Sequence, residues 1–221
     1  VPGKSGAPYH LQLCSLHPMD REGEMVLQLM HEDDVLYSIA FSFFGCPLRS
    51  TLGVSVGCVQ GPKGQESAHR VREATRDVHG MRPKTLMVRL VRQLGYEHGC
   101  RQMLLVGNIN RAVHHSAKKG RLFADYNALW QELGAQARQD GDFELACEDL
   151  PLPALQEIPS KKRSEARKRH ELTLAMIASL RSGLDAHRST VQVATPSAAI
   201  AANDVRQSAG LDDDDYVSAA A

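Results

Sequence analysis

The chain has 221 residues, 43% of them hydrophobic, which suits one domain with a sizeable core. Its 26 Lys and Arg residues balance 26 Asp and Glu residues, and this zero net charge argues against a protein that binds nucleic acid over its whole surface. No apolar run approaches the roughly 20 residues that span a bilayer. Five widely spaced cysteines without a CxxC pair argue against a structural zinc site or a disulfide framework, so we expect a cytoplasmic protein with reduced thiols.

The first third of the chain predicts a sheet. After a start expected to be flexible (residues 1–8), short apolar or alternating runs are separated by Pro, Gly and acidic turn residues. Because the connections are short, the strands should form an antiparallel meander. The expected strands are 9–16, 25–31, 35–44 and 52–60. In the last of them, Gly53 and Gly57 are available for a β-bulge or for the close approach of a ligand.

The middle of the chain changes to helical periodicity. A helix is expected over 67–79, and a second over 83–98 with a continuous apolar face. The residues on that face are Leu86, Met87, Leu90, Val91 and Leu94. Residues 103–107 then form a continuous apolar run, typical of a buried strand. We therefore expect this strand to lie parallel to 52–60 after a right-handed crossover. A helix beginning at Asp125 and a strand over 143–148 come next along the chain.

The segment His79-Gly80-Met81-Arg82-Pro83-Lys84 separates the two expected helices. Gly80 suits the left-handed residue that ends a helix, and Pro83 suits the first turn of the next one. The free N–H groups of that turn, the helix dipole, Arg82 and Lys84 would converge on one point. The segment therefore predicts an anion site, the alternative being two solvated cations beside a turn.

A last helix is expected to begin at Pro159-Ser160, with a cationic first three turns and one acidic residue, Glu165. The cations are Lys161, Lys162, Arg163, Arg167, Lys168 and Arg169, and the expected buried stripe is Ala166, His170, Leu174, Ile177 and Leu184. This face suits a phosphate or a lipid headgroup, or it is simply a solvated charged face. RNA ranks lower because no aromatic residue lies between the cations. Residues 189–221 read as a low-complexity acidic tail.

Several motifs resemble the bacterial VirK/YbjX family, in the same order and at the same spacing. They are VREATRDVHGMRPKTLMVRLVRQL, LLVGN, DYNALWQELGA and EIPSKKRSEARKRHELT, and the resemblance covers roughly residues 9–185. It implies a single VirK/YbjX domain, taken here as 9–188, and an association with virulence and with resistance to cationic antimicrobial peptides in Gram-negative bacteria. It does not supply a biochemical activity.

The order of elements is that of an N-acetyltransferase-like (GNAT-like) α+β fold: a mixed sheet of antiparallel meander plus one parallel crossover, with a C-terminal helix. In such a fold an acyl donor enters between the two parallel strands, and its pyrophosphate rests on a helix N-terminus. The candidate catalytic residues are His79, Tyr126 and Asn108. The candidate donor-binding residues are Arg82, Lys84, Lys161, Lys162 and Arg163. The candidate substrate-binding residues are Asn110, His114, Trp130 and Arg169, and no metal site is expected.

Three functions remain open on the sequence alone. The first is an acyl- or aminoacyl-transferase that uses a coenzyme A thioester or an aminoacyl donor and a small-molecule or peptide amine as acceptor. The second is a non-catalytic envelope-stress factor that binds an anionic partner, such as a lipid headgroup, through its basic face. The third is an RNA-binding regulator. An open cleft between 52–60 and 103–107 would favour the first, and a filled seam with an open basic surface would favour the second.

Overall fold

The structure is a computed structural model that describes residues 1–46, 51–112 and 124–193. The chain divides into two compact units, residues 1–182 and 183–221, and the first unit contains the whole sheet. Residues 1–8, expected to be flexible, are hydrogen-bonded to the first strand and the first long helix. The Val1 amine donates to the Tyr9 carbonyl (2.8 Å), and the Ser5 N–H donates to the Asp77 carboxylate (2.6 Å).

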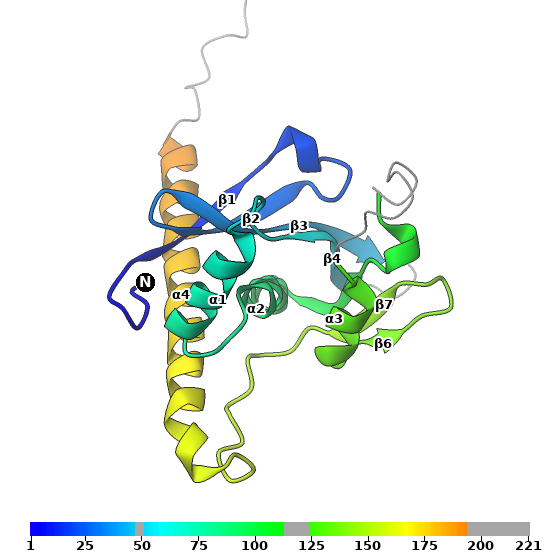
Figure 1. The fold of residues 1–221 in the computed structure, drawn as a ribbon. Coiled ribbons are helices and arrows are strands. Elements are labelled where there is room, and N and C mark those ends of the chain that lie inside the picture. The colour runs from blue at the N-terminus through cyan, green and yellow to red at the C-terminus, as the bar shows by residue number, and fades with distance from the viewer. Residues whose placement is uncertain (47–50, 113–123, 194–221) are drawn as a thin grey trace, which may run out of the picture. The chain divides into compact units, whose positions relative to one another are not determined.

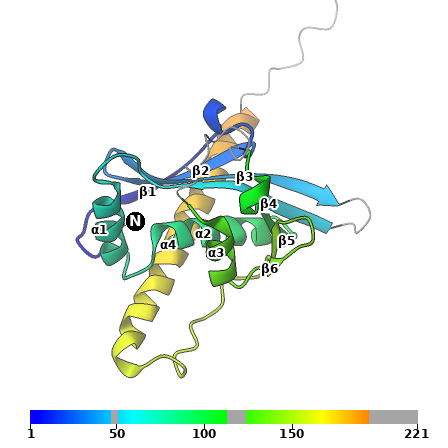
Figure 2. The ribbon, with the colours of Figure 1, turned by 45° about the vertical axis from the view of Figure 1, so that its right-hand side comes forward.

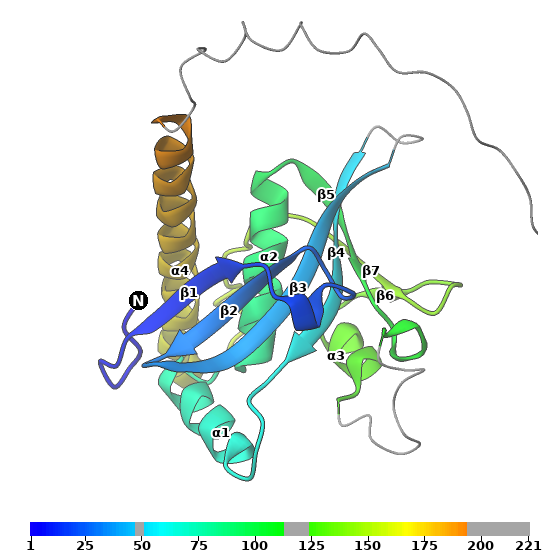
Figure 3. The same ribbon diagram turned by 90° about the horizontal axis from the view of Figure 1, so that it is seen from above.

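The described residues form a seven-stranded mixed sheet with the order β1-β2-β3-β4-β5-β7-β6 (Figure 3). The strands are β1 (Tyr9–Cys14), β2 (Met25–His31), β3 (Asp34–Cys46), β4 (Thr51–Gln60), β5 (Cys100–Leu105), β6 (Gln136–Ala137) and β7 (Phe143–Ala146). Strands β1 to β4 are an antiparallel meander, as the sequence predicted. The short strand β6 was not predicted, and β7 ends two residues earlier than expected.

Gly57 is the extra residue of a β-bulge in β4. Ala40 of β3 pairs with Cys58, whereas the next residue, Phe41, pairs with Val56, so Gly57 is left without a partner in the ladder. A Cβ atom at this position would lie 2.1 Å from the carbonyl oxygen of Glu22. Only glycine therefore fits here, and the bulge turns the carboxyl end of β4 away from a regular ladder.

Strands β4 and β5 are the parallel neighbours that the sequence predicted. They are connected through α1 (Ser67–Asp77) and α2 (Pro83–Glu97), which lie on one side of the sheet (Figure 2). The five residues expected on the apolar face of α2 are each at most 4% exposed. The predicted α+β arrangement, a mixed sheet of antiparallel meander plus one parallel crossover with a C-terminal helix, is confirmed.

The turn between α1 and α2 differs from its prediction. His79 (φ 57°) takes the left-handed conformation first, and Gly80 (φ 75°) comes directly after it. The Gly80 N–H donates to the Thr75 carbonyl (2.7 Å), which makes His79 the C′ residue of a Schellman-type helix end. Gly80 was the wrong choice for that position, although a Cβ on it would lie only 2.7 Å from an oxygen of Glu165. The left-handed conformation of Gly80 favours glycine, and a Cβ there would also make the Glu165 side chain shift.

The remaining helices are η1 (His17–Met19), η2 (Asn108–Asn110), α3 (Tyr126–Glu132) and α4 (Ser160–Val193) (Figure 1). Among the α4 residues whose burial is described, the buried ones are Leu172, Thr173, Met176, Ile177 and Leu180. Of the predicted stripe, Ile177 is buried and Ala166, His170 and Leu184 are half-buried, but Leu174 was wrong because it is 46% exposed. None of the helices in the described part of the chain combines the length and the hydropathy that crossing a membrane requires.

Candidate functional site

The candidate site lies where β4 and β5 part. The parallel ladder ends at the pair Val56–Leu105, beyond which the Val106 N–H makes a last hydrogen bond to the Val56 carbonyl (3.0 Å). Strand β4 continues to Gln60, while the chain after β5 turns into η2. Main-chain groups on this edge of β4 consequently need a partner other than β5.

The Tyr126 hydroxyl provides that partner. It accepts a hydrogen bond from the Val59 N–H (2.7 Å) and donates one to the Val59 carbonyl (2.8 Å). Tyr126 is the first residue of α3, which lies beside the carboxyl ends of β4 and β5 (Figure 3). A single side chain from another element thus completes the ladder that β5 leaves unfinished.

Tyr126 is 2% exposed, and its hydroxyl also lies 3.5 Å from the Cys58 thiol. The guanidinium carbon of Arg111 lies 3.9 Å from the centre of its ring, a cation–π arrangement. Burial, and after it the nearby Cys58, raises the pKa of Tyr126 well above its usual value. Burial likewise raises the pKa of Cys58. At neutral pH the tyrosine is therefore a proton donor rather than a base.

Trp130 fills the rest of the seam. It lies one turn after Tyr126 on α3 and is fully buried, and the ring centres are 5.5 Å apart at an angle of 64°. Its indole N–H donates to the Val106 carbonyl just past the end of β5 (2.8 Å). Among the residues that the structure describes, Tyr126 and Trp130 therefore fill the seam between β4 and β5, where the sequence had left an open cleft as one alternative.

Asn108 holds the start of α3 against the end of β5. Its side-chain oxygen accepts from the Tyr126 N–H (2.9 Å), and its side-chain N–H donates to Asp125 (2.9 Å). Its own main-chain N–H donates to the side chain of Asn127 (2.9 Å). Asp125 caps the helix by accepting from the Ala128 N–H (3.1 Å). The bond from Asn108 is the main cause that lowers the pKa of Asp125. Asn108 thus positions Tyr126 by hydrogen-bonding its backbone.

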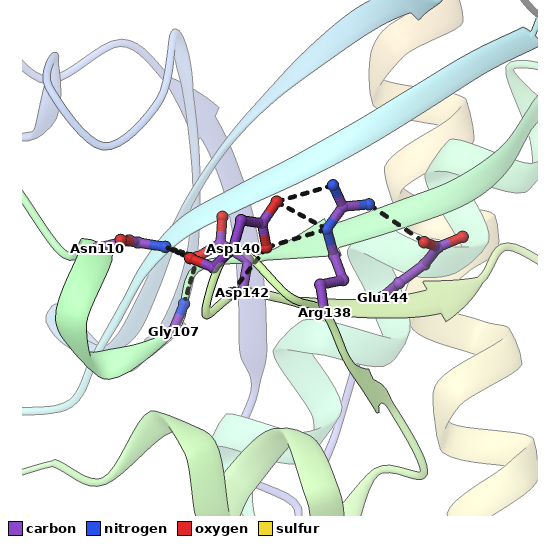
Figure 4. Close-up of polar contacts among 6 residues, drawn as sticks. All are labelled: Gly107, Asn110, Arg138, Asp140, Asp142 and Glu144. Atoms are coloured by element: carbon purple, nitrogen blue, oxygen red, sulfur yellow. Dashed lines mark hydrogen bonds and ion pairs between the residues drawn. The ribbon is translucent and has the colours of Figure 1, made fainter.

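Asn110 belongs to a separate polar network at the β6–β7 turn (Figure 4). Its side-chain N–H group donates to the Asp142 carboxylate and to the Asp140 carbonyl, each at 2.8 Å. The same Asp142 oxygen accepts from the Gly107 N–H (2.8 Å). Arg138 pairs with Asp140 and Glu144 in the same turn (2.8 and 3.3 Å). The network fastens the segment after β5 to β7, and the Asn110 amide nitrogen is already engaged in it.

Arg82 and Lys84 at the start of α2 face acidic residues of α3. Arg82 forms an ion pair with Glu132. Desolvation, and after it the charge of Arg82, lowers the pKa of Lys84, and the charge of Asp125 opposes that shift. The Arg82 carbonyl accepts from the N–H groups of both Thr85 and Leu86 (2.9 and 3.1 Å). The predicted anion site is therefore adjacent to the seam, but Arg82 is already paired with a carboxylate there.

The other candidate site residues from the sequence lie in the α1–α2 turn, in α4 or outside the described residues. His79 is half-buried in that turn, and Arg169 pairs with Glu165 (3.1 Å), which packs against Gly80. Within the described ranges no hydrogen bond or ion pair joins Arg82 or Lys84 to residues 161–169. Lys161, Lys162 and Arg163 are exposed, and Arg163 donates to the Ile158 carbonyl (2.9 Å). His114 lies outside the described residues.

Sequence reasoning missed Val59, Cys58 and Glu132. Val59 acts only through its backbone, which no side-chain pattern reveals, and Glu132 could have been noticed only as an acid near a predicted cation. In the portion of the chain that the structure describes, no three His, Cys, Asp or Glu side chains gather as a metal ion would require. Cys14, Cys58, Cys100 and Cys147 are free thiols there.

Comparison with known proteins agrees with the family read from the motifs. A family model described as "Protein of unknown function (DUF535)" matches residues 1–182. The chain belongs to the DUF535 family. It is 28% identical over 174 residues to the uncharacterized protein YbjX of Escherichia coli (strain K12), across 77% of this chain and 52% of that protein. An uncharacterized protein of Haemophilus influenzae (strain ATCC 51907 / DSM 11121 / KW20 / Rd) is 29% identical over 164 residues, across 73% of this chain and 52% of its own length.

This DUF535 chain spans about half the length of the curated relatives it matches. Solved structures similar to it include a mutant of the AtaT toxin bound to the C-terminus of the antitoxin AtaR and acetyl-CoA (14% identity, TM-score 0.31, 59% of this chain and 70% of that chain). A mutant of the cAMP-binding acyltransferase from Mycobacterium smegmatis is 9% identical, with a TM-score of 0.38, over 80% of this chain and 55% of that chain. Similarities at these TM-scores carry no weight for function, so the fold assignment rests on strand order and pairing.

Proposed function

We propose that this DUF535 chain is a GNAT-like acyl- or aminoacyl-transferase that moves a group from a phosphate-bearing donor, such as a coenzyme A thioester, to an amine-type acceptor. The observation that carries the proposal is the parting of β4 and β5 beside Val59. The main-chain N–H and carbonyl groups of Val59 have no partner on β5. Both are hydrogen-bonded to one side-chain hydroxyl, that of Tyr126. An extended donor carrying amide groups can bond the same two main-chain groups when that hydroxyl moves aside.

In this mechanism the acceptor amine attacks the donor carbonyl, a C–N bond forms, and the bond to the leaving sulfur or oxygen breaks. The amine loses a proton, and the leaving group gains one. Tyr126, which is protonated at neutral pH and whose hydroxyl lies at the seam, is the candidate that supplies the second proton. Asn108 acts as a positioning residue through its bond to the Tyr126 N–H. His79 is the second candidate for proton transfer, at the start of the turn that precedes α2.

The donor's phosphates would be bound by the α2 N-terminus together with Arg82 and Lys84. This requires the phosphate to replace the Glu132 carboxylate as the partner of Arg82. Glu132 therefore competes with the donor, which gives the proposal a matched pair of variants with opposite expected effects. Trp130 would form the apolar wall of the acceptor side, and its backbone hydrogen bond fixes its ring.

Calorimetric titration with acetyl-CoA tests the proposal. Arg82→Ala should weaken binding by about 1–3 kcal/mol, the contribution of a charge-assisted hydrogen bond, whereas Glu132→Gln should strengthen it. Tyr126→Phe should lower turnover in an amine acetylation assay without weakening binding, because the hydroxyl that competes for Val59 is gone. His79→Ala lowers turnover by about 10²-fold or more if it is the base. No binding of acetyl-CoA to the wild type, or equal effects of Arg82→Ala and Glu132→Gln, would contradict this donor site.

A second candidate function is supported by the closed seam and by the exposed cations at the start of α4. In this alternative the chain is a non-catalytic factor that binds an anionic partner through Lys161, Lys162 and Arg163, in keeping with the virulence association that the VirK/YbjX resemblance implies. Vesicles containing anionic lipid distinguish the two candidates. Salt-sensitive binding that is lost on replacing all three cations with Gln, with no acetyl-CoA binding, would favour this alternative.

A further inference from the structure

A cavity of about 280 Å³ lies in the first unit between α2, the segment 148–158 and the part of α4 before Ser182. None of its lining residues belongs to the proposed transfer site, whose residues come from β4, η2, α3, the start of α2 and the turn before it. Its walls combine two kinds of side chain. They are the arginines Arg89, Arg92 and Arg169 and apolar residues such as Leu150, Ile158 and Ala166.

One of the three arginines that line this cavity has no carboxylate partner among the described residues. Arg92 pairs with Glu148 (3.2 Å) and Arg169 with Glu165 (3.1 Å). Arg89 pairs with no carboxylate among the residues that the structure describes, and its polar contact is the Met81 sulfur at 4.0 Å. Two of the three arginines are therefore paired with carboxylates, and Arg89 is not. Desolvation, and after it the charges of Arg169 and Arg92, lowers the pKa of Arg89.

Arg169 independently indicates that the cavity lacks a hydrogen-bond acceptor. Its Nε atom is buried and has no hydrogen-bond partner among the described residues, although the Nη2 atom of the same side chain reaches Glu165. A buried donor without an acceptor costs about 1–3 kcal/mol of stability, so such donors are normally satisfied. A bound anion would satisfy it and would supply the counter-charge for Arg89.

The cavity is held open by hydrogen bonds that do not involve a ligand. Gln93 of α2 is 4% exposed; its side-chain oxygen accepts from the Leu150 N–H (2.8 Å) and its N–H group donates to Asp149 (2.9 Å). Arg92 also donates from Nε to the Ala146 carbonyl (2.6 Å). These bonds fasten the segment after β7 to α2. The lining of the cavity is therefore ordered before a ligand binds, so binding costs the protein little conformational entropy.

We infer that this cavity binds a small amphiphilic anion, with one carboxylate or phosphate head on Arg89 and Arg169 and a short apolar tail along Leu150, Ile158 and Ala166. Arg89, the arginine without a carboxylate partner, suits a ligand with one anionic head group. The volume lies just below the range of roughly 300–1,000 Å³ typical of pockets for drug-sized ligands, which limits the tail to one short alkyl chain. Inorganic phosphate should bind more weakly because it leaves the apolar wall exposed to water.

Calorimetry with octanoate, octyl phosphate, octanol and inorganic phosphate tests this inference on the full chain. We expect octanoate or octyl phosphate to bind, and the tighter of the two identifies the head group. Arg89→Gln should weaken that binding at least about tenfold, through loss of a charge-assisted contact. Ala166→Phe should weaken it as much by filling the cavity while leaving every charge in place. Lys168→Gln, on the exposed face of the same helix, is the matched control and should have no effect.

Three results would overturn the inference. They are the absence of binding by both anionic probes to the wild type, full binding to Ala166→Phe, and a loss in Lys168→Gln equal to that in Arg89→Gln. Thermal unfolding of each variant, measured by circular dichroism, confirms that the variant proteins are folded. Because none of these readouts requires acetyl-CoA or turnover, a failed transferase assay leaves this test intact.

Discussion

Replacing Tyr126 with Phe isolates the hydroxyl that closes the β4–β5 seam. The variant keeps the ring, and with it the Trp130 and Arg111 contacts, but removes both hydrogen bonds to Val59, at 2.7 and 2.8 Å. Because Tyr126 is 2% exposed, water does not readily replace the lost partner. Each buried main-chain group left unsatisfied costs about 1–3 kcal/mol, and relaxation of the seam offsets part of the sum. We expect Tyr126→Phe to lower the free energy of unfolding by about 2–3 kcal/mol.

Urea unfolding monitored by circular dichroism gives this free energy, with Tyr96→Phe as the matched control. The ring of Tyr96 lies 5.3 Å from the guanidinium carbon of Arg101, and Phe retains that contact, so the control should cost less than about 0.5 kcal/mol. A Tyr126→Phe cost as small as that of the control would refute the reasoning. It would mean that the Val59 groups do not depend on the hydroxyl and that the seam is already open in solution.

Two further predictions concern thiol ionisation and the β6–β7 turn. Burial, and after it the nearby Cys100, raises the pKa of Cys147 from 9.0 to about 11, so the unfolded chain loses this proton at lower pH than the folded one. Stability should therefore fall by up to about 2 kcal/mol as pH rises from 9 to 11, and urea unfolding of Cys147→Ala should show a smaller fall over the same range. Asp142→Ala removes the acceptor for Gly107 and Asn110 and should cost about 1–2 kcal/mol in the same assay, while Asp142→Asn, which keeps one oxygen, should cost less.

Much of the fold could be predicted from the sequence because the patterns that indicate its helices and strands are local and repeated. The five-residue apolar face of α2 recurs at helical spacing, and all five residues are buried. The continuous run at 103–106 indicated a covered strand, and the crossover rule then fixed its parallel partner. Gly57 could be named as a possible bulge, but only the pairing of Ala40 and Phe41 with β4 shows that it is one. By contrast, β6 has two residues, too few for any periodicity.

The site was less readable because its contacts are long-range and use the backbone. Tyr126 and Trp130 were identifiable as one helical face, yet nothing in their spacing says that a hydroxyl and an indole N–H bond the ends of β4 and β5. The buried stripe of α4 was misplaced in part for a related reason. Leu174 is exposed, whereas Thr173 next to it is buried, with its hydroxyl satisfied by the Arg169 carbonyl of its own helix (2.8 Å).

The closed seam bears on the transferase proposal through an exchange of hydrogen bonds. The tyrosine hydroxyl donates one bond to Val59 and accepts one from it, which is also what a secondary amide of an extended donor offers. Replacing the two hydrogen bonds between Tyr126 and Val59 with two between the donor and Val59 is nearly neutral in free energy. The seam itself therefore does not strongly favour either the open or the closed form. Affinity must then come from outside the seam, from the phosphates at Arg82 and Lys84 after they displace Glu132. This is why the opposite effects expected of Arg82→Ala and Glu132→Gln discriminate between the two candidate functions more sharply than any variant inside the seam.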